Sequence, residues 1–218
     1  MKTCTTLWLL CLFFNTTAQF QDDFSDGDLS NNPAWQGDTA HFMVNPSYSL
    51  QLNQTVAGNS VLSSPNLSYN LDNSSWKFDL KQSFSGSANN RSKIFLMSDS
   101  SHANPYNGIY LLFGESGSLD ALRLIQIMDG VEKELGKGQD GELASSFQIR
   151  VEVERSETGN WTVNYGINAS SLNQAFTGQE EFMPRGEYFV WDCKYTASNA
   201  QKFELDNVFV GNVAPDVR

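Results

Sequence analysis

The chain has 218 residues, with 25 acidic and 14 basic side chains and a formal net charge of −11 at pH 7. Nucleic acids and anionic membrane surfaces are bound mainly through Lys and Arg, so this balance argues against both as partners. The only cysteine beyond residue 18 is Cys193, which excludes a disulfide within that part of the chain. About 200 residues are nevertheless enough to bury a sufficient core without one.

Residues 1–18 have the pattern of a secretory signal. Lys2 precedes an apolar run at residues 7–14, which is too short to span a bilayer, and small residues end the segment at Ala18. We therefore expect cleavage after Ala18 and a secreted chain, extracellular or on a bacterial cell surface, with a charge of −12 once Lys2 is removed. The alternative is a short buried helix. No later stretch is apolar for long enough to predict a membrane span.

The rest of the chain reads as one domain at residues 19–211 and a polar tail at 212–218. Short runs of alternating apolar and polar residues, separated by Gly, Asn, Ser and Asp, predict strands along this domain. Helical periodicity is weak, and its best candidate is the short segment 170–176. The predicted strands lie within residues 41–53, 75–84, 92–99, 108–114, 121–130, 146–156, 160–168, 187–196 and 202–211.

Two of these runs show how the strands face a core. In "FQIRVEVER" the apolar residues Phe147, Ile149, Val151 and Val153 alternate with polar ones, which predicts one dry face. "KFELDNVFV" alternates in the same way until its phase breaks near Asn207, where we expect a β-bulge. Nine such runs at roughly ten-residue spacing predict an all-β, two-sheet antiparallel sandwich.

The opening "DDFSDGDLSNNPAWQGD" and the closing "CKYTASNAQKFELDNVFVG" carry a family resemblance over nearly the whole domain. The chain resembles a concanavalin A-like jelly-roll domain, of the lectin and glucanase type. Such domains stand at the N-terminus of secreted surface proteins of polysaccharide-degrading bacteria, often before lamin-tail domains. The resemblance implies a fold and a place outside the cell, and it names no ligand.

The leading functional hypothesis is a non-catalytic module that binds a polysaccharide or a cell-surface glycan. Sugars are recognised by exposed aromatic faces together with polar side chains that bond to the hydroxyls. The loop "SSHANPYNG" offers such groups, and Tyr106 is its best candidate because it lies between strands. Core packing is the alternative for each Trp. The candidate binding residues are Trp35, Trp76, His102, Asn104, Tyr106 and Asn107.

A structural calcium site is a further prediction. "DFSDGD" does not keep the spacing of an EF-hand loop, but in a jelly roll the first and last strands pair. Asp22 or Asp23 would then meet Asp206, and carboxylates from adjacent strands suit calcium. The alternative is a turn at residues 26–28, with Asp206 capping the following backbone.

Two other function classes remain open. A family 16-like glycoside hydrolase would need E-x-D-x-x-E on one strand, and "ELDNVF" supplies Glu204 and Asp206 but places Phe209 where the acid belongs. Glu152 and Glu154 share a face without a third carboxylate, so we expect no enzymatic activity. A structural domain that binds other surface proteins is equally compatible with the composition.

Overall fold

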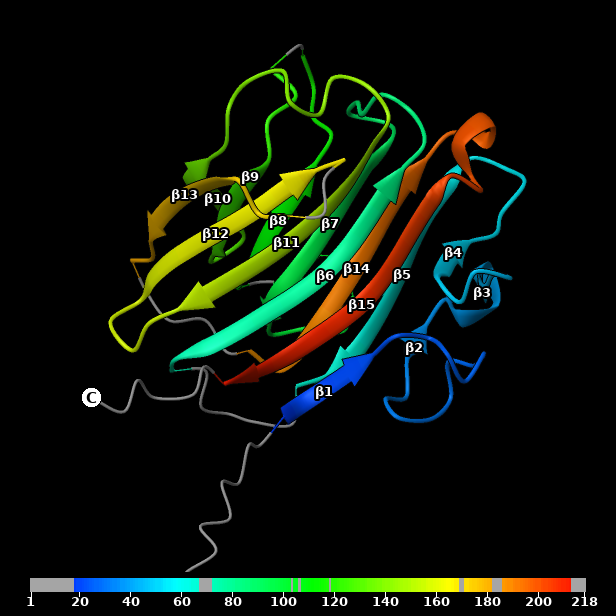
Figure 1. Ribbon diagram of the computed structural model, residues 1–218, viewed down its shortest axis with the longest axis horizontal. Coiled ribbons are helices and arrows are strands. Elements are labelled where there is room, and N and C mark those ends of the chain that lie inside the picture. Colours follow the sequence, from blue (N-terminus) through cyan, green and yellow to red (C-terminus); the bar gives the residue numbers. More distant parts are fainter. Residues whose placement is uncertain are drawn as a thin grey trace, which may run out of the picture.

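The computed structural model describes residues 18–66, 72–102, 104–105, 107–117, 119–168, 171–181 and 186–212. These residues form two antiparallel sheets packed face to face, as Figure 1 shows, with only two 3-10 turns, η1 (Thr39–His41) and η2 (Ala197–Asn199). The strands run from Ala18 to Asn212. The predicted all-β sandwich is therefore confirmed.

Each sheet mixes strands from distant parts of the chain. The eight-stranded sheet has the order β13 (Gln174–Gln179), β12 (Asn160–Ile167), β11 (Phe147–Arg155), β6 (Ser74–Gln82), β15 (Phe203–Asn212), β4 (Leu50–Leu52) and β3 (Phe42–Val44), with β1 (Ala18–Asp22) also paired to β15. The seven-stranded sheet has the order β10 (Val131–Lys137), β9 (Arg123–Met128), β8 (Gly108–Phe113), β7 (Arg91–Ser98), β14 (Tyr188–Tyr195), β5 (Gly58–Pro65) and β2 (Gln36–Gly37).

The core lies between the sheets and is built by strand alternation. On β11 the residues Phe147, Ile149, Val151 and Val153 are buried, as predicted, whereas Gln148, Arg150 and Glu154 face outward. β6 is buried along most of its length. The indole rings of Trp76 and Trp161 stack at the centre with centroids 5.2 Å apart. Burial on one face fixes the register of these strands, because a slip of one residue would expose every core side chain.

The short helical candidate does not form a helix. The segment 170–176 was the best helical candidate, but residues 174–179 form β13, an edge strand paired to β12. The tertiary context decides this, because the exposed edge of β12 offers a full row of backbone hydrogen bonds to a short segment of weak propensity. β10 approaches β13 at Gly136, where any side chain would meet the Thr177 carbonyl, and this contact joins the edges of the two sheets.

β15 positions the site described below. One of its edges pairs with β6 along its length. Its other edge is shared by two short strands: β4 pairs with Glu204 and Leu205, and β1 pairs from Val208 onward. The strand is interrupted between these two partners, because Asn207 has a φ of 51° and the register to β6 shifts between Asp206 and Phe209. The predicted bulge at Asn207 and the predicted pairing of the first and last strands are both confirmed.

Candidate functional site: a groove across the eight-stranded sheet

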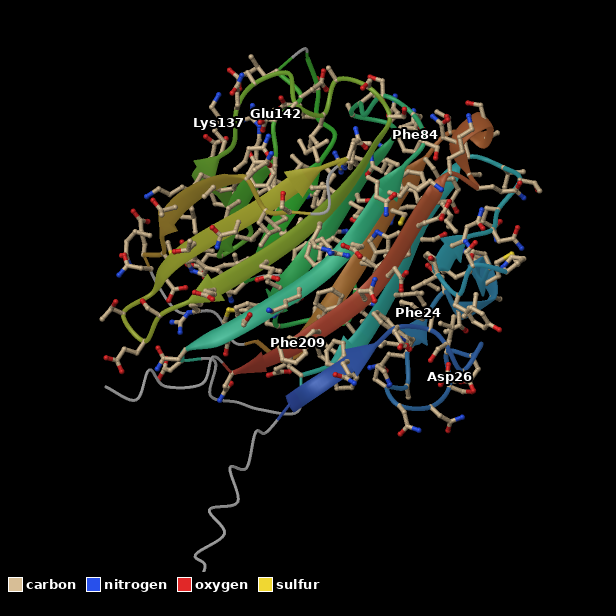
Figure 2. All side chains as sticks on the ribbon, in the orientation of Figure 1. Phe24, Asp26, Phe84, Lys137, Glu142 and Phe209 are labelled. Carbon is tan, nitrogen blue, oxygen red and sulfur yellow. The ribbon has the colours of Figure 1, made fainter. Side chains whose placement is uncertain are left out.

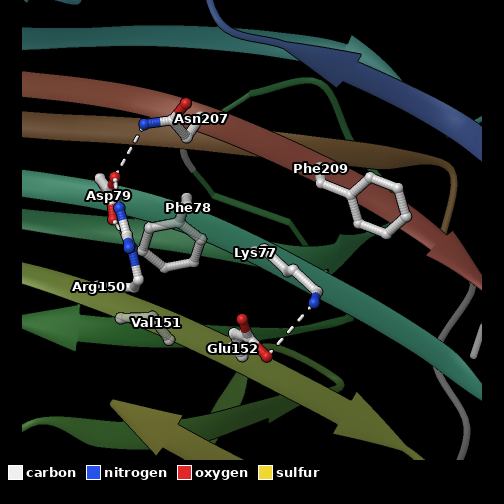
Figure 3. Close-up of a pocket in the computed structure, with 8 residues that line it drawn as sticks. All are labelled: Lys77, Phe78, Asp79, Arg150, Val151, Glu152, Asn207 and Phe209. Atoms are coloured by element: carbon white, nitrogen blue, oxygen red, sulfur yellow. Dashed lines mark hydrogen bonds and ion pairs between the residues drawn. The ribbon is translucent and has the colours of Figure 1, made fainter. Parts of the chain in front are cut away.

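The outer face of the eight-stranded sheet carries two adjoining hollows. The first, of about 370 Å³, crosses β11, β6 and β15 (Figure 3). It is lined by Lys77, Phe78, Asp79, Arg150, Val151, Glu152, Asn207 and Phe209. Its polar groups are the outward members of alternating strands whose inward members build the core. The hollow therefore combines hydrogen-bonding groups with an aromatic ring on a rigid sheet.

The bulge decides which side chains of β15 reach this hollow. Asp206 faces outward, and the extra residue Asn207 delays the next outward position to Phe209. The neighbours of Phe209, Val208 and Val210, are both buried in the core. Figure 2 shows Phe209 near the end of β15. The bulge thus places a polar amide and an aromatic ring on the same face of the strand.

The ring of Phe209 has a defined seat on its own strand. It lies over Gly211, two residues further along the same face, where a β-carbon would stand 2.5 Å from Phe209 Cζ. Any side chain at position 211 would therefore push the ring away. The glycine keeps the ring low along β15, and the ring is half-buried rather than fully exposed.

Asp79 is the centre of the polar network in the first hollow. Arg150 donates two parallel hydrogen bonds to it, from Nε to Oδ1 at 2.8 Å and from Nη2 to Oδ2 at 2.9 Å. Asn207 Nδ2 donates a third at 2.9 Å, drawn in Figure 3. The hydrogen bonds that Arg150 donates to Asp79, together with the negative charge of Asp79, raise the pKa of Arg150, which secures its charge. The bidentate pair fixes the guanidinium plane, while about half of the Arg150 side chain stays open to a ligand.

The second hollow continues the groove beyond β15. Its volume is about 840 Å³, and it shares Asn207 and Phe209 with the first. Its remaining wall consists of Val208, the β1 residues Phe20, Gln21 and Asp22, and the loop residues Asp23, Ser25, Asp26, Asn32 and Pro33. The two hollows therefore adjoin at Asn207 and Phe209, and together we call them the sheet groove.

The predicted calcium ligands do not converge. Asp22 is 7% exposed and accepts hydrogen bonds from the Trp35 indole at 2.7 Å and from the Phe24 amide at 2.8 Å. Burial, opposed by these bonds, raises its pKa to about 6. Asp23 accepts two hydrogen bonds from Ser25 instead. Among the residues that the structure describes, no group of three or more His, Cys, Asp or Glu side chains is placed to hold a metal.

The contacts of Asp206 fit the alternative prediction for it, capping of the following backbone, better than calcium binding. Its Oδ1 accepts the Asn207 amide at 2.7 Å, and its Oδ2 accepts the Ser49 hydroxyl at 3.2 Å. Its pKa is raised by burial first, and then by the nearby charges of Asp79 and Asp23. Asp23 and Asp206 thus share one acidic region, while the carboxylate of Asp22 is engaged by the Trp35 indole and the Phe24 amide.

The two tryptophans assigned to a carbohydrate site need correction. Trp76 is completely buried and stacks on Trp161, while Trp35 is 5% exposed and packs against Phe20, Phe24 and Phe189. Neither ring has a face available to a ligand. The alternative of core packing is correct for both, because indoles of this size supply the bulk that fills the space between the sheets.

The loop candidates lie away from the sheet groove. His102 and Asn104 are exposed on the connection between β7 and β8, in the other sheet. Asn107 ties this loop down by donating to Asp99 from its backbone and its side chain and by accepting the Asp129 amide. None of the three lines either hollow. Tyr106 lies outside the described residues, so its assignment stays a prediction.

The groove residues themselves were missed by the sequence analysis, although a signal for them existed. Arg150 and Glu152 are polar positions of "FQIRVEVER", a run that the sequence analysis uses only to predict one dry face and to weigh Glu152 and Glu154 as catalytic acids. Phe209 was noted only as the residue that replaces a catalytic acid. An aromatic side chain that faces outward from a strand would have marked the site. Which way Phe209 faces, however, can be predicted only once the bulge at Asn207 is located.

No protein family model and no curated protein sequence matches this chain. Solved structures do match it. The VIP36 exoplasmic/lumenal domain in its Ca2+/Man-bound form has a TM-score of 0.62 at 10% identity, over 93% of each chain. The legume lectin-like domain from Entamoeba histolytica gives 0.56 at 11% identity, over 85% of this chain and 92% of that one.

A bacterial module has the same architecture. The carbohydrate binding module CBM66 from Bacillus subtilis gives a TM-score of 0.51 at 12% identity, over 82% of this chain and 95% of that one. At such identities the likeness shows the fold, which is the lectin-like jelly roll expected from the sequence. Within the described residues, no helix is both long enough and apolar enough to cross a membrane.

Proposed function

We propose that this protein is a secreted, non-catalytic module that binds a glycan in the sheet groove. The observation that carries the proposal is the first hollow, where the Phe209 ring and the fixed Asp79–Arg150–Asn207 network line the same cavity (Figure 3). An aromatic face packs on the C–H groups of a sugar ring, and the carboxylate, guanidinium and amide bond to its hydroxyls. The lectin-like neighbours, two of them named as carbohydrate-bound or carbohydrate-binding, support it.

The proposal assigns binding and no bond cleavage to this groove. Hydrolysis with retention needs two carboxyl groups about 5 Å apart, one of them free to give a proton. Asp79 is held by two hydrogen bonds from Arg150. On β15, Phe209 stands at the position where the E-x-D-x-x-E pattern of family 16-like hydrolases has its last carboxylate. We assign the groove no calcium, because its nearest carboxylates are already engaged by Ser25, Ser49 and backbone amides.

We place the protein outside the cell, on or near a bacterial surface, where polysaccharides and surface glycans are available. The predicted leader at residues 1–18 supports this location. A protein partner on the same surface remains the alternative ligand.

The proposal is tested by binding of the purified chain to an array of neutral glycans, with calcium and with a chelator. Phe209→Ala should lower the affinity for the bound glycan by about threefold to tenfold, the size of an aromatic contact. Chelation should change nothing. Tyr48→Ala is the matched control, because Tyr48 is 57% exposed and lines neither hollow.

Two outcomes would contradict the proposal. An array without any binding would leave a structural or protein-binding domain as the better account. Binding that survives Phe209→Ala but is lost in Tyr106→Ala would move the site to the loop between β7 and β8.

A further inference from the structure

The charges along the sheet groove are unevenly distributed. In the first hollow each cation faces a carboxylate: Arg150 is bonded to Asp79, and Lys77 lies 3.4 Å from Glu152. In the second hollow the charged lining residues are Asp22, Asp23 and Asp26, and no described cation lines it. The groove therefore has a balanced end on β6 and β11 and an acidic end at β1.

The balanced end gives no preference to an ionic ligand. Two of the guanidinium's donor atoms, Nε and Nη2, already serve Asp79, so a ligand carboxylate would compete with an internal one for them. An ammonium group would meet Arg150 and Lys77 as like charges. Hydroxyl groups, which both donate and accept, fit such a mixed set of paired charges without a desolvation penalty for an unpaired ion.

The acidic end disfavours anions directly. Asp23 and Asp26 are exposed, and hydrogen bonds from Ser25 lower the pKa of Asp23, so its carboxylate is charged at neutral pH. These groups lie within one Debye length of a ligand in the hollow they line, so salt screens their repulsion only in part. A chain of uronic or sulfated sugars would carry a like charge into this hollow at every residue.

We infer that the sheet groove takes an internal stretch of an uncharged polysaccharide, laid across β15 with sugar residues in both hollows and Phe209 between them. The inference rests on the proposed function and adds the ligand class to it. The two hollows form one continuous groove because they share Asn207 and Phe209. The groove crosses the strands in the order β11–β6–β15–β1, and at about 4.8 Å between neighbouring strands the distance from β11 to β1 is roughly 14 Å. That is longer than one sugar ring.

The test compares polymers that differ in charge, using affinity electrophoresis of the full chain at about 0.15 M salt. The probes are galactan and polygalacturonate, with mannan and carboxylated mannan as a second pair. We expect retardation by the uncharged member of a pair only. A soluble oligosaccharide of the bound polymer should compete better than its monosaccharide at equal sugar-residue concentration.

Asp23→Asn with Asp26→Asn removes two charges while keeping the side-chain oxygens that accept bonds from Ser25 and Asp28. This double variant should gain about threefold or more in affinity for the carboxylated polymer at low salt and keep its affinity for the neutral one. Asp129→Asn with Glu157→Gln removes the same charge outside both hollows and should gain less.

The outcomes separate this inference from the proposed function. Three outcomes would overturn the inference: tighter binding of the carboxylated polymer, equal binding of both polymers with no effect of the double variant, or competition by the monosaccharide that is as strong as by the oligosaccharide. If binding still depended on Phe209 in these cases, the proposed glycan-binding function would stand. Binding of chitosan that requires Asp23 and Asp26 would overturn it in favour of a cationic ligand. Failure of every polymer to bind would remove the proposed function itself.

Discussion

Single residues on β15 determine what the sheet presents to a ligand. One inserted residue, Asn207, sets Phe209 on the outer face and supplies an amide to Asp79. One missing side chain, at Gly211, leaves room for the Phe209 ring. Asparagine tolerates the positive φ of 51° better than most residues, because its short polar side chain can form local hydrogen bonds in the left-handed conformation. The groove thus depends on backbone details as much as on its polar groups.

Gly211→Ala tests whether the seat of the ring matters. The added methyl group collides only with the far end of the Phe209 ring, so we expect the ring to move at a stability cost of about 1 kcal/mol or less. Glycan affinity should fall toward that of Phe209→Ala. In the Phe209→Ala background the same change should have no further effect. Additive losses in the double variant would show that Gly211 acts independently of the ring.

A second single residue, Asp22, makes the folding stability depend on pH. Its folded-state pKa of about 6 lies above the ordinary value near 3.8, so the folded protein binds this proton more tightly than the unfolded chain. Stability is therefore expected to fall as pH rises from about 4 to about 6, by up to ~3 kcal/mol for this group. Denaturant unfolding at several pH values measures it.

Asp22→Asn supplies the reference for that measurement, since other carboxylates titrate in the same range. The wild-type stability minus the variant stability should decline between pH 4 and pH 6 and stay constant above. Parallel curves for the two proteins would contradict the assignment of a raised pKa to Asp22.

At the scale of elements, the sequence predicted the strands that alternate and missed those that do not. β11 was readable because its four apolar residues mark one face. β5 was missed although it pairs with β14 along its length, because Ser60, Ser63 and Ser64 occupy buried positions where an apolar side chain is expected. β10 was missed because it is an exposed edge strand whose charges pair across to Lys93 and Arg123 instead of alternating.

The same limit applies to the candidate site. The outward position of Arg150 follows from the alternation of β11 alone, so its exposure was predictable from the sequence. Its partner Asp79 lies 71 residues away and is reached only through the pairing of β11 with β6. Trp35 and Trp76 are candidates on residue type, but the structure buries both rings. Residue type alone could not have located a groove that depends on sheet order.

The whole molecule combines a fold shared with lectin-like domains with a local surface of its own. Identities of 10 to 12% to the VIP36 and CBM66 domains show that the sandwich tolerates almost complete sequence change. Function on such a fold belongs to particular sites. An overall charge of −11 keeps the molecule soluble and repels anionic polymers at long range, which agrees with a groove for uncharged chains.

The most direct test of the central claim is a titration of the isotope-labelled chain with its bound neutral oligosaccharide, followed by amide chemical shifts. The account predicts that the largest changes lie at Asp79, Arg150, Asn207 and Phe209 and extend to β1. Changes concentrated at His102, Asn104 and Asn107, with the outer face of the eight-stranded sheet unaffected, would contradict it and place the site on the loop between β7 and β8.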